Sequence, residues 1–212
     1  MIRSLALGTI ALTFLVCPRA QADDKADADF ATLYADAWKT PDKADMTKLR
    51  QAFTETSKYQ PYSLDRDEKA GVEKALSKGD VPGAIAAMNV VLEKKPLNFE
   101  HHAFAAFLHM KAGDKDLEAK HKAMTVAIMK SMLEGHDGKT FATSIPVIDV
   151  GEEYMILRSM KAKTKGQSLR THEGHFFDVH AIADPETGKD REVFFNIDTP
   201  HNALSKMLKQ KK

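Results

Sequence analysis

The segment KGDVPGAIAAMNVVLEKKP, residues 78–96, contains a chain turn followed by a helical pattern of apolar residues. Gly79 supplies the left-handed position that ends one helix, Asp80 can cap the next helix, and Pro96 stops it. The dipeptide Gly-Asp returns at residues 113–114, 34 residues later, again between two segments of helical apolar spacing. This interval is typical of a helix–turn–helix unit, which buries its apolar face only by stacking on a neighbour.

The first unit resembles the second half of a tetratricopeptide repeat in residue type and spacing. The matching residues are Gly79-Asp80, Ala84-Ile85, Leu92-Glu93 and Pro96. The second unit departs from the pattern, because Glu118 stands where the first unit has the small Ala84, and its last helix continues to Leu133. The resemblance predicts two helical hairpins over 67–135. A free-standing solenoid needs about three units, so a groove for an extended peptide would be short.

The N-terminus has the pattern of a secretory signal peptide over 1–22. Arg3 gives a basic start, an apolar run follows, and Ala20-Gln21-Ala22 is a small-x-small cleavage sequence. Val16 is too bulky for a lipoprotein signal, so we expect cleavage after Ala22 rather than lipidation of Cys17. Cleavage removes the only cysteine and two arginines, which leaves 29 Lys and Arg against 30 Asp and Glu. The sequence thus predicts a periplasmic or secreted protein without disulfides or a retained membrane anchor.

The segments around the repeat predict an α+β fold. Residues 23–66 show two helical patterns separated by Thr40-Pro41, and we interpret them as a cap on the open end of the repeat. A ligand-stacking cluster is the alternative use of their aromatic residues. Residues 136–212 predict a small antiparallel sheet with one or two extra helices, packed on the repeat as one unit. In this region, 161–166 is read as a basic loop and 175–182 as the strongest strand.

The chain from 23 onward resembles a family of exported bacterial proteins catalogued only as a domain of unknown function. The stretches that carry this resemblance are Tyr59-Gln60-Pro61-Tyr62, Pro96-Leu97-Asn98, 147–154, Phe177-Asp178-Val179 and 194–197. The resemblance implies a fold and export. It implies no activity.

Our leading functional hypothesis is a non-catalytic module that binds or scaffolds a peptide or protein partner. Helical repeats present a concave face to such partners. In this chain that face would contain His101, Phe104 and Phe107.

A second hypothesis is a hydrolase-like enzyme with its site at the junction of a helix and the sheet. Glu153, Tyr154 and Arg158 follow helical spacing, and Asp178 interrupts an otherwise apolar strand. Acids in the first turn of a helix are also explained by capping, and Tyr154 can contact Arg158 one turn later. We therefore assign no residue a catalytic role from the sequence.

A third hypothesis is a small-molecule or metal binder that uses His172 or His175 beside the aromatic face of the sheet. His175 and His180 are separated by an odd number of residues, so a regular strand directs them to opposite faces. The sequence shows no phosphate-binding glycine loop, no dinucleotide fingerprint and no clustered basic surface. We predict no cofactor, no metal and no nucleic-acid partner. The oligomeric state is left open.

Overall fold

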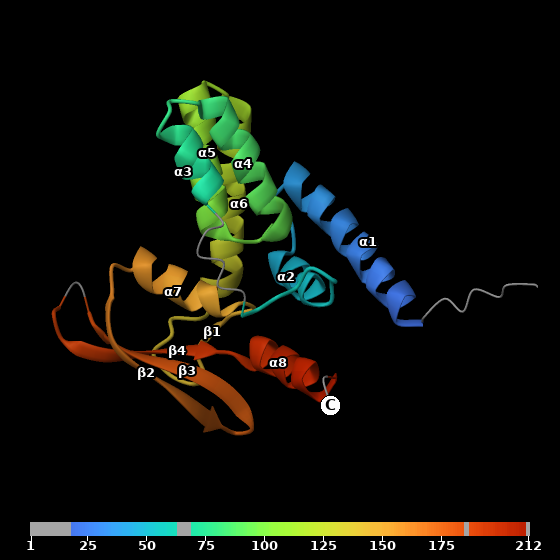
Figure 1. The fold of residues 1–212 in the computed structure, drawn as a ribbon. Helices are drawn as coiled ribbons and strands as arrows, with labels where there is room; N and C mark the ends of the chain where they lie inside the picture. Colours follow the sequence, from blue (N-terminus) through green and yellow to red (C-terminus); the bar gives the residue numbers. More distant parts are fainter. Residues whose placement is uncertain (1–17, 63–68, 185–186, 211–212) are drawn as a thin grey trace, which may run out of the picture.

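The structure is a computed structural model that describes residues 18–62, 69–184 and 187–210. The predicted signal peptide falls mostly outside these residues, and no side chain before Asp24 is described. Within the described chain, six helices come first and a four-stranded mixed sheet follows, with a helix at its end (Figure 1). The predicted α+β class is confirmed. None of the helices in this part of the chain is long and apolar enough to cross a bilayer.

The boundaries of the elements are as follows. The helices are α1 (Pro18–Lys39), α2 (Met46–Thr54), α3 (Ala70–Leu76), α4 (Val81–Lys94), α5 (Phe99–Ala112), α6 (Lys115–Leu133), α7 (Val150–Ser159) and α8 (Asp198–Gln210). The strands are β1 (Ile145–Pro146), β2 (Lys163–His172), β3 (His175–Ala183) and β4 (Asp190–Asn196).

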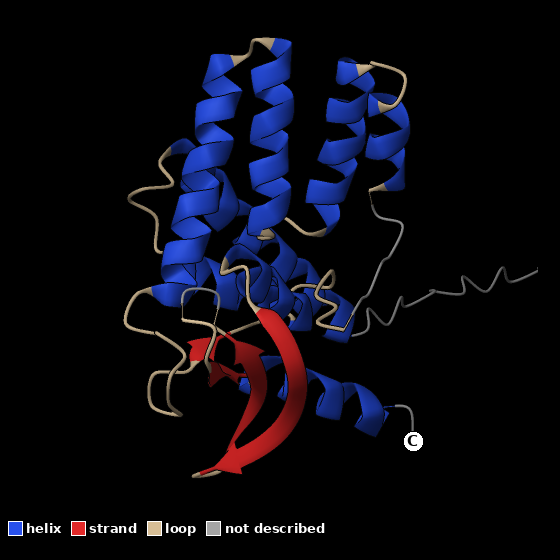
Figure 2. Cartoon of the chain, turned by 90° about the vertical axis from the view of Figure 1, so that its left-hand side faces the viewer, coloured by secondary structure: helices blue, strands red, loops and turns tan. Residues whose placement is uncertain are grey.

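The two Gly-Asp turns have the same backbone geometry. Gly79 and Gly113 have φ angles of 73° and 79°, a region that residues with a Cβ rarely occupy. The next residue caps a helix in both cases. Asp80 accepts a hydrogen bond from Gly83 N at 2.8 Å, and Asp114 accepts one from Leu117 N at 3.1 Å. The turns join α3 to α4 and α5 to α6, which stand side by side above the sheet (Figure 2).

Helix α1 ends and helix α2 begins where the sequence predicts. Residues 40–45 separate α1 from α2, and Asp45 caps α2 by accepting a hydrogen bond from Lys48 N at 2.9 Å. Leu49 packs in the main core, together with side chains from α6, α7 and the sheet. A second core, which includes Val72, Met88 and Leu108, lies between the helices of the hairpins.

The sheet has the strand order β1-β4-β3-β2 and differs in two ways from the predicted antiparallel sheet. The short strand β1 runs parallel to β4, because Ile145 pairs with Phe195 across a long connection. Strand β2 begins at Lys163, inside the predicted basic loop. Its side chains are almost all exposed, so no apolar alternation marks it in the sequence, and its pairing with β3 is what makes it a strand.

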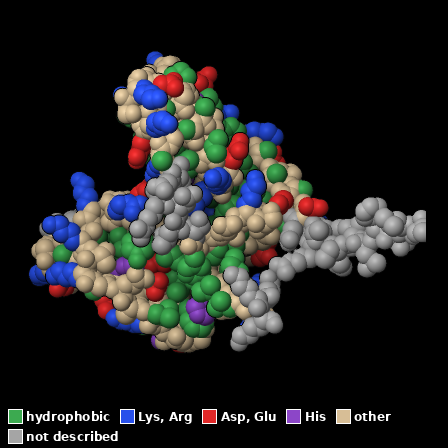
Figure 3. Space-filling model, in the orientation of Figure 1, with side chains coloured by type: hydrophobic (Ala, Val, Ile, Leu, Met, Phe, Trp, Pro, Cys, Tyr) green, Lys and Arg blue, Asp and Glu red, His purple; other side chains and the backbone are tan. Residues whose placement is uncertain are grey.

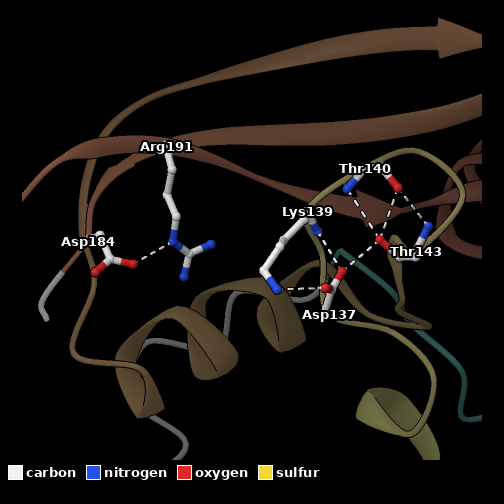
Figure 4. A network of polar contacts seen from close by, with 6 residues as sticks. All are labelled: Asp137, Lys139, Thr140, Thr143, Asp184 and Arg191. Carbon is white, nitrogen blue, oxygen red and sulfur yellow. Dashed lines mark hydrogen bonds and ion pairs between the residues drawn. The ribbon is translucent and has the colours of Figure 1, made fainter. Parts of the chain in front are cut away.

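Each face of the sheet is covered differently. Ile182, Val193 and Phe195 face the main core, whereas Phe177, Val179 and Phe194 form a small cluster on the other face with Phe141. Phe141 is placed by the loop between α6 and β1. In this loop Asp137 accepts hydrogen bonds from Lys139 N and Thr143 Oγ1 (Figure 4). Nearby, an ion pair joins Asp184, which directly follows β3, to Arg191 of β4.

Candidate functional site

Helix α7 lies against the sheet and carries two acids in its first turn, Glu152 and Glu153. Its N-terminus is capped by Asp149, whose carboxylate accepts a hydrogen bond from Gly151 N at 2.6 Å. Because adjacent helix positions point about 100° apart, the two acids face different neighbours. Glu152 faces α2, and Glu153 faces β3.

Glu152 forms a buried ion pair with Arg50 of α2, with 2.6 Å between the guanidinium and the carboxylate. The same oxygen, Oε2, accepts a hydrogen bond from Ile148 N at 2.8 Å. Tyr59 Oη donates to the carbonyl of Ile148 at 2.5 Å. These contacts join α2, the segment after it and the start of α7. They indicate a positioning role for Glu152 and Arg50.

Glu153 forms a hydrogen bond with His180 of β3, with 2.8 Å between Oε2 and Nε2. Both side chains are 0% exposed. The other polar atoms, Glu153 Oε1 and His180 Nδ1, are buried and have no hydrogen-bond partner among the described residues. Burial raises the pKa of Glu153 to about 7, although the hydrogen bond from His180 opposes the shift. A substrate could not touch this pair without a rearrangement of α7.

A chain of surface hydrogen bonds lies beside the buried pair. Tyr154 Oη donates to Gln167 Oε1 at 2.8 Å, and Gln167 Nε2 donates to Asp178 Oδ2 at 2.8 Å. The ring of Tyr154 also meets His180 edge-on, with 5.5 Å between ring centroids. Burial, and then the charges of Asp178 and Glu153, raise the pKa of Tyr62. We call Tyr62, Glu153, Tyr154, Gln167, Asp178 and His180 the junction site.

Arg158 does not join the junction site. Its guanidinium forms two hydrogen bonds with the carboxylate of Glu100 on α5, at 3.1 and 2.7 Å. Of the four residues that the sequence suggested for a hydrolase, the structure brings Glu153, Tyr154 and Asp178 together and directs Arg158 away from them.

The three residues suggested on the helical hairpins do not form one exposed surface. His101 is buried, whereas Phe107 is 40% exposed. Phe104 is half-buried and packs against the core of the hairpins. Its ring stacks on that of Phe107 at 6.0 Å between centroids, and Lys111 Nζ lies 4.9 Å from the ring of Phe107.

An open groove of about 720 Å³ lies instead between α1 and the helices α4 and α6. We call it the α1 groove. Its walls are largely apolar and aromatic, and Trp38 meets the ring of His121 edge-on at 4.9 Å between centroids. The lining residues are Asp27, Phe30, Ala31, Tyr34, Ala35, Trp38, Thr56, Lys58, Ile85, Asn89, Leu92, Glu93, Pro96, His109, Leu117 and His121.

Hydrogen bonds fix the tautomer of His121, which lines the α1 groove, through its neighbour His102. His102 Nε2 lies 2.8 Å from the carbonyl of Pro96, which can only accept, so this nitrogen carries a proton. In a neutral ring His102 Nδ1 then accepts from His121 Nδ1, 2.9 Å away. Burial lowers the pKa of His102 to about 4 and that of His121 to about 3, which keeps both rings neutral near pH 7.

A smaller pocket of about 310 Å³ contains both histidines of the third hypothesis, together with His136 and Ser144. His172 stacks on Phe141 at 4.4 Å between ring centroids, and His175 Nδ1 lies 2.6 Å from Asp198 Oδ2. In the described part of the chain, no three histidine, cysteine or acidic side chains are grouped as metal ligands.

The model of a family described as a domain of unknown function, DUF4919, matches residues 34–206. The chain belongs to the DUF4919 family. No curated protein and no solved structure matches it. The DUF4919 match runs from the last part of α1 into α8 and includes the whole junction site. It includes most of the α1 groove, but Asp27, Phe30 and Ala31 lie before it.

Stretches that carried the family resemblance in the sequence meet at the junction site of this DUF4919 protein. Val150 N donates to the carbonyl of Pro61 at 3.1 Å, which brings Tyr62 to the start of α7. Asp178 pairs in register with Phe195 of β4. The sequence did not reveal His180 as a partner of Glu153. The alternation of side chains along a strand shows only that His180 and His175 point to opposite faces. The alternation of β3 places Asp178, His180 and Ile182 on one face, and this signal was available.

Proposed function

We propose that this DUF4919 protein is a binding module that holds an extended peptide segment of a partner protein in the α1 groove. The observation that carries the proposal is the groove itself, with a volume of about 720 Å³ and a row of aromatic side chains along one wall. Ligand sites in proteins usually have volumes of about 300–1,000 Å³ and mostly apolar linings with a few polar groups. Phe30, Tyr34 and Trp38 recur at intervals of four residues on α1, so they form a continuous stripe.

The polar groups of the groove suit a peptide backbone. His121 Nε2 is left as a hydrogen-bond acceptor by the tautomer derived above, and the exposed amide of Asn89 can both donate and accept. The charges at the rim are mixed, with Asp27 and Glu93 against Lys58. A peptide with an apolar or aromatic anchor residue fits this lining better than a strongly charged one.

Less supports the hydrolase hypothesis. Glu153 and His180 are fully buried, and Arg158 is held by Glu100. The third hypothesis is supported by a smaller pocket, and His175, which lines it, is already paired with Asp198.

The proposal can be tested by selecting random decapeptides on the purified protein and titrating the enriched ones. Trp38 is the only tryptophan in the sequence and lines the groove, so its fluorescence reports binding there. We expect Kd values in the micromolar range, because short peptides lose much entropy on binding. Ala35→Arg fills the groove from an exposed position and should weaken binding at least tenfold.

The matched control is Ala28→Arg, an exposed residue of α1 that does not line the groove. It should leave the Kd unchanged. The proposal is wrong if no peptide is enriched, or if the enriched peptides bind the Ala35→Arg variant as tightly as the original protein.

A further inference from the structure

The junction site has more hydrogen-bond acceptors than donors. The carboxylate of Asp178 receives one hydrogen bond, from Gln167 Nε2, among the described residues. Tyr62 is 41% exposed, and its hydroxyl forms no hydrogen bond among the described residues. Tyr154 donates its proton to Gln167, so its oxygen can still accept. A ligand that completes this site must therefore bring donors.

The carboxylate of Asp178 also has no counter-charge among the described residues. Within the described residues, no lysine or arginine forms an ion pair with Asp178 or Glu153. Three cations on neighbouring elements are engaged elsewhere: Arg158 with Glu100, Arg170 with Glu192 and Lys165 with Asp190. Burial raises the pKa of Tyr154 most, and the negative charges of Glu153 and Asp178 raise it further.

Figure 3 shows one face of the molecule with its side chains coloured by type. Hydrophobic side chains gather on its lower part, where the sheet lies, and acidic groups are found among them. Lys and Arg side chains lie around this area rather than on it. An aromatic surface next to an unpaired carboxylate attracts cations, because ring faces carry partial negative charge and the carboxylate supplies a full one.

We propose that the junction site binds a cationic organic group, an ammonium or a guanidinium, at the surface formed by Tyr62, Tyr154 and Asp178. Asp178 forms a charge-assisted hydrogen bond with the ligand, and the two tyrosines, 41% and 38% exposed, cover its alkyl part or its charged face. The site lies outside the α1 groove and does not depend on its function. An anion would be repelled here, and a hard metal ion would need about six oxygen ligands.

The test uses butylammonium and its uncharged isostere 1-butanol as probes, with the full chain and detection by isothermal titration and by NMR shifts. We expect saturable, millimolar binding of butylammonium and none of the alcohol. Lysine and arginine with both backbone ends blocked form a second arm. Tighter binding of these derivatives than of butylammonium indicates a side chain of a peptide, and the reverse order indicates a free amine. Either order supports the proposal.

Asp178→Asn removes the charge and keeps an oxygen that can accept from Gln167, so it should weaken cation binding at least tenfold. Asp190→Asn is the matched control, because Asp190 is an exposed acid of the same sheet and pairs with Lys165. It should have no effect. Tyr154→Leu removes an aromatic ring from the site and should also weaken cation binding. Thermal unfolding shows whether each variant is folded. The proposal is overturned if no probe binds saturably, if the alcohol binds as well as butylammonium, or if folded Asp178→Asn binds like the original protein.

Discussion

The carboxylate of Glu153 and the imidazole of His180 lie 2.8 Å apart, and neither side chain is exposed to solvent. Glu153 comes from the first turn of α7 and His180 from the middle of β3, so their contact joins the helix to the sheet. Because one atom of each side chain stays without a partner among the described residues, the pair is costly to bury. Its protonation therefore affects stability.

The first prediction concerns the pH dependence that Glu153 causes. Its pKa is raised from 4.5 to about 7 in the folded protein, so the folded state binds more protons than the unfolded state between these values. This contribution to stability is fully present below pH 4.5 and is lost as the pH rises through 7. One pKa unit corresponds to about 1.4 kcal/mol, so we expect a loss of about 3 kcal/mol.

Urea unfolding at a series of pH values measures this effect. Glu153→Gln keeps an acceptor for His180 and should flatten the decline. Glu134→Gln, at an exposed position, is the control and should leave it unchanged. An equal decline in Glu153→Gln and the original protein would contradict the prediction.

The second prediction concerns His102 and His121, whose effect on the pH dependence of stability has the opposite sign. Their pKa values are lowered from 6.5 to about 4 and about 3, so the unfolded state binds more protons below pH 6.5. Their contribution is present above pH 6.5 and is lost as the pH falls toward 4. The shift of His102 alone corresponds to about 3 kcal/mol.

A variant with both His102→Gln and His121→Gln should lose less stability than the original protein between pH 6.5 and 4. Its unfolding free energy is compared by urea titration with that of His172→Gln, a half-exposed control. If the double variant and the control show the same acid sensitivity, the two buried rings are not responsible for it.

The third prediction concerns the buried ion pair of Arg50 and Glu152, whose side chains are both 4% exposed. Arg50→Met leaves the carboxylate without its counter-charge and should cost about 3–5 kcal/mol. Replacing both residues with methionine should cost less than the sum of the two single changes, since no charge is then left buried. A urea-based double-mutant cycle gives the coupling energy. Lys39→Met breaks an exposed pair with Asp36 and should cost less than about 1 kcal/mol.

The fourth prediction concerns the two Gly-Asp turns. Asp80→Ala and Asp114→Ala each remove a hydrogen bond to the first turn of a helix and should each cost about 1 kcal/mol. Asp116→Ala removes an exposed acid of α6 that caps nothing and should cost less. Thermal or urea unfolding measures all three. Unequal effects of the two cap variants would show that the turns are not equivalent, and would weaken the interpretation of the hairpins as repeats.

Local patterns in the sequence were sufficient for most of the helical part. The spacing of Gly79 and Gly113, the caps Asp80 and Asp114 and the stop at Pro96 all act within a few residues, so they could be recognised without a structure. The same holds for the break between the first two helices at residues 40–45. The pairing of β1 with β4 and the length of β2 could not be derived in this way, because neighbouring strands supply their hydrogen bonds.

The sequence by itself determined which residues form helices, where these helices are capped and that a small sheet follows, because these properties depend on near neighbours. Only the tertiary structure decided which side chains meet. It buried His101, directed Arg158 to Glu100, joined Glu153 to His180 and opened the groove beside Trp38. These contacts join residues up to about a hundred positions apart, as in the pair of Arg50 and Glu152, and packing between elements fixes them, which no local pattern encodes.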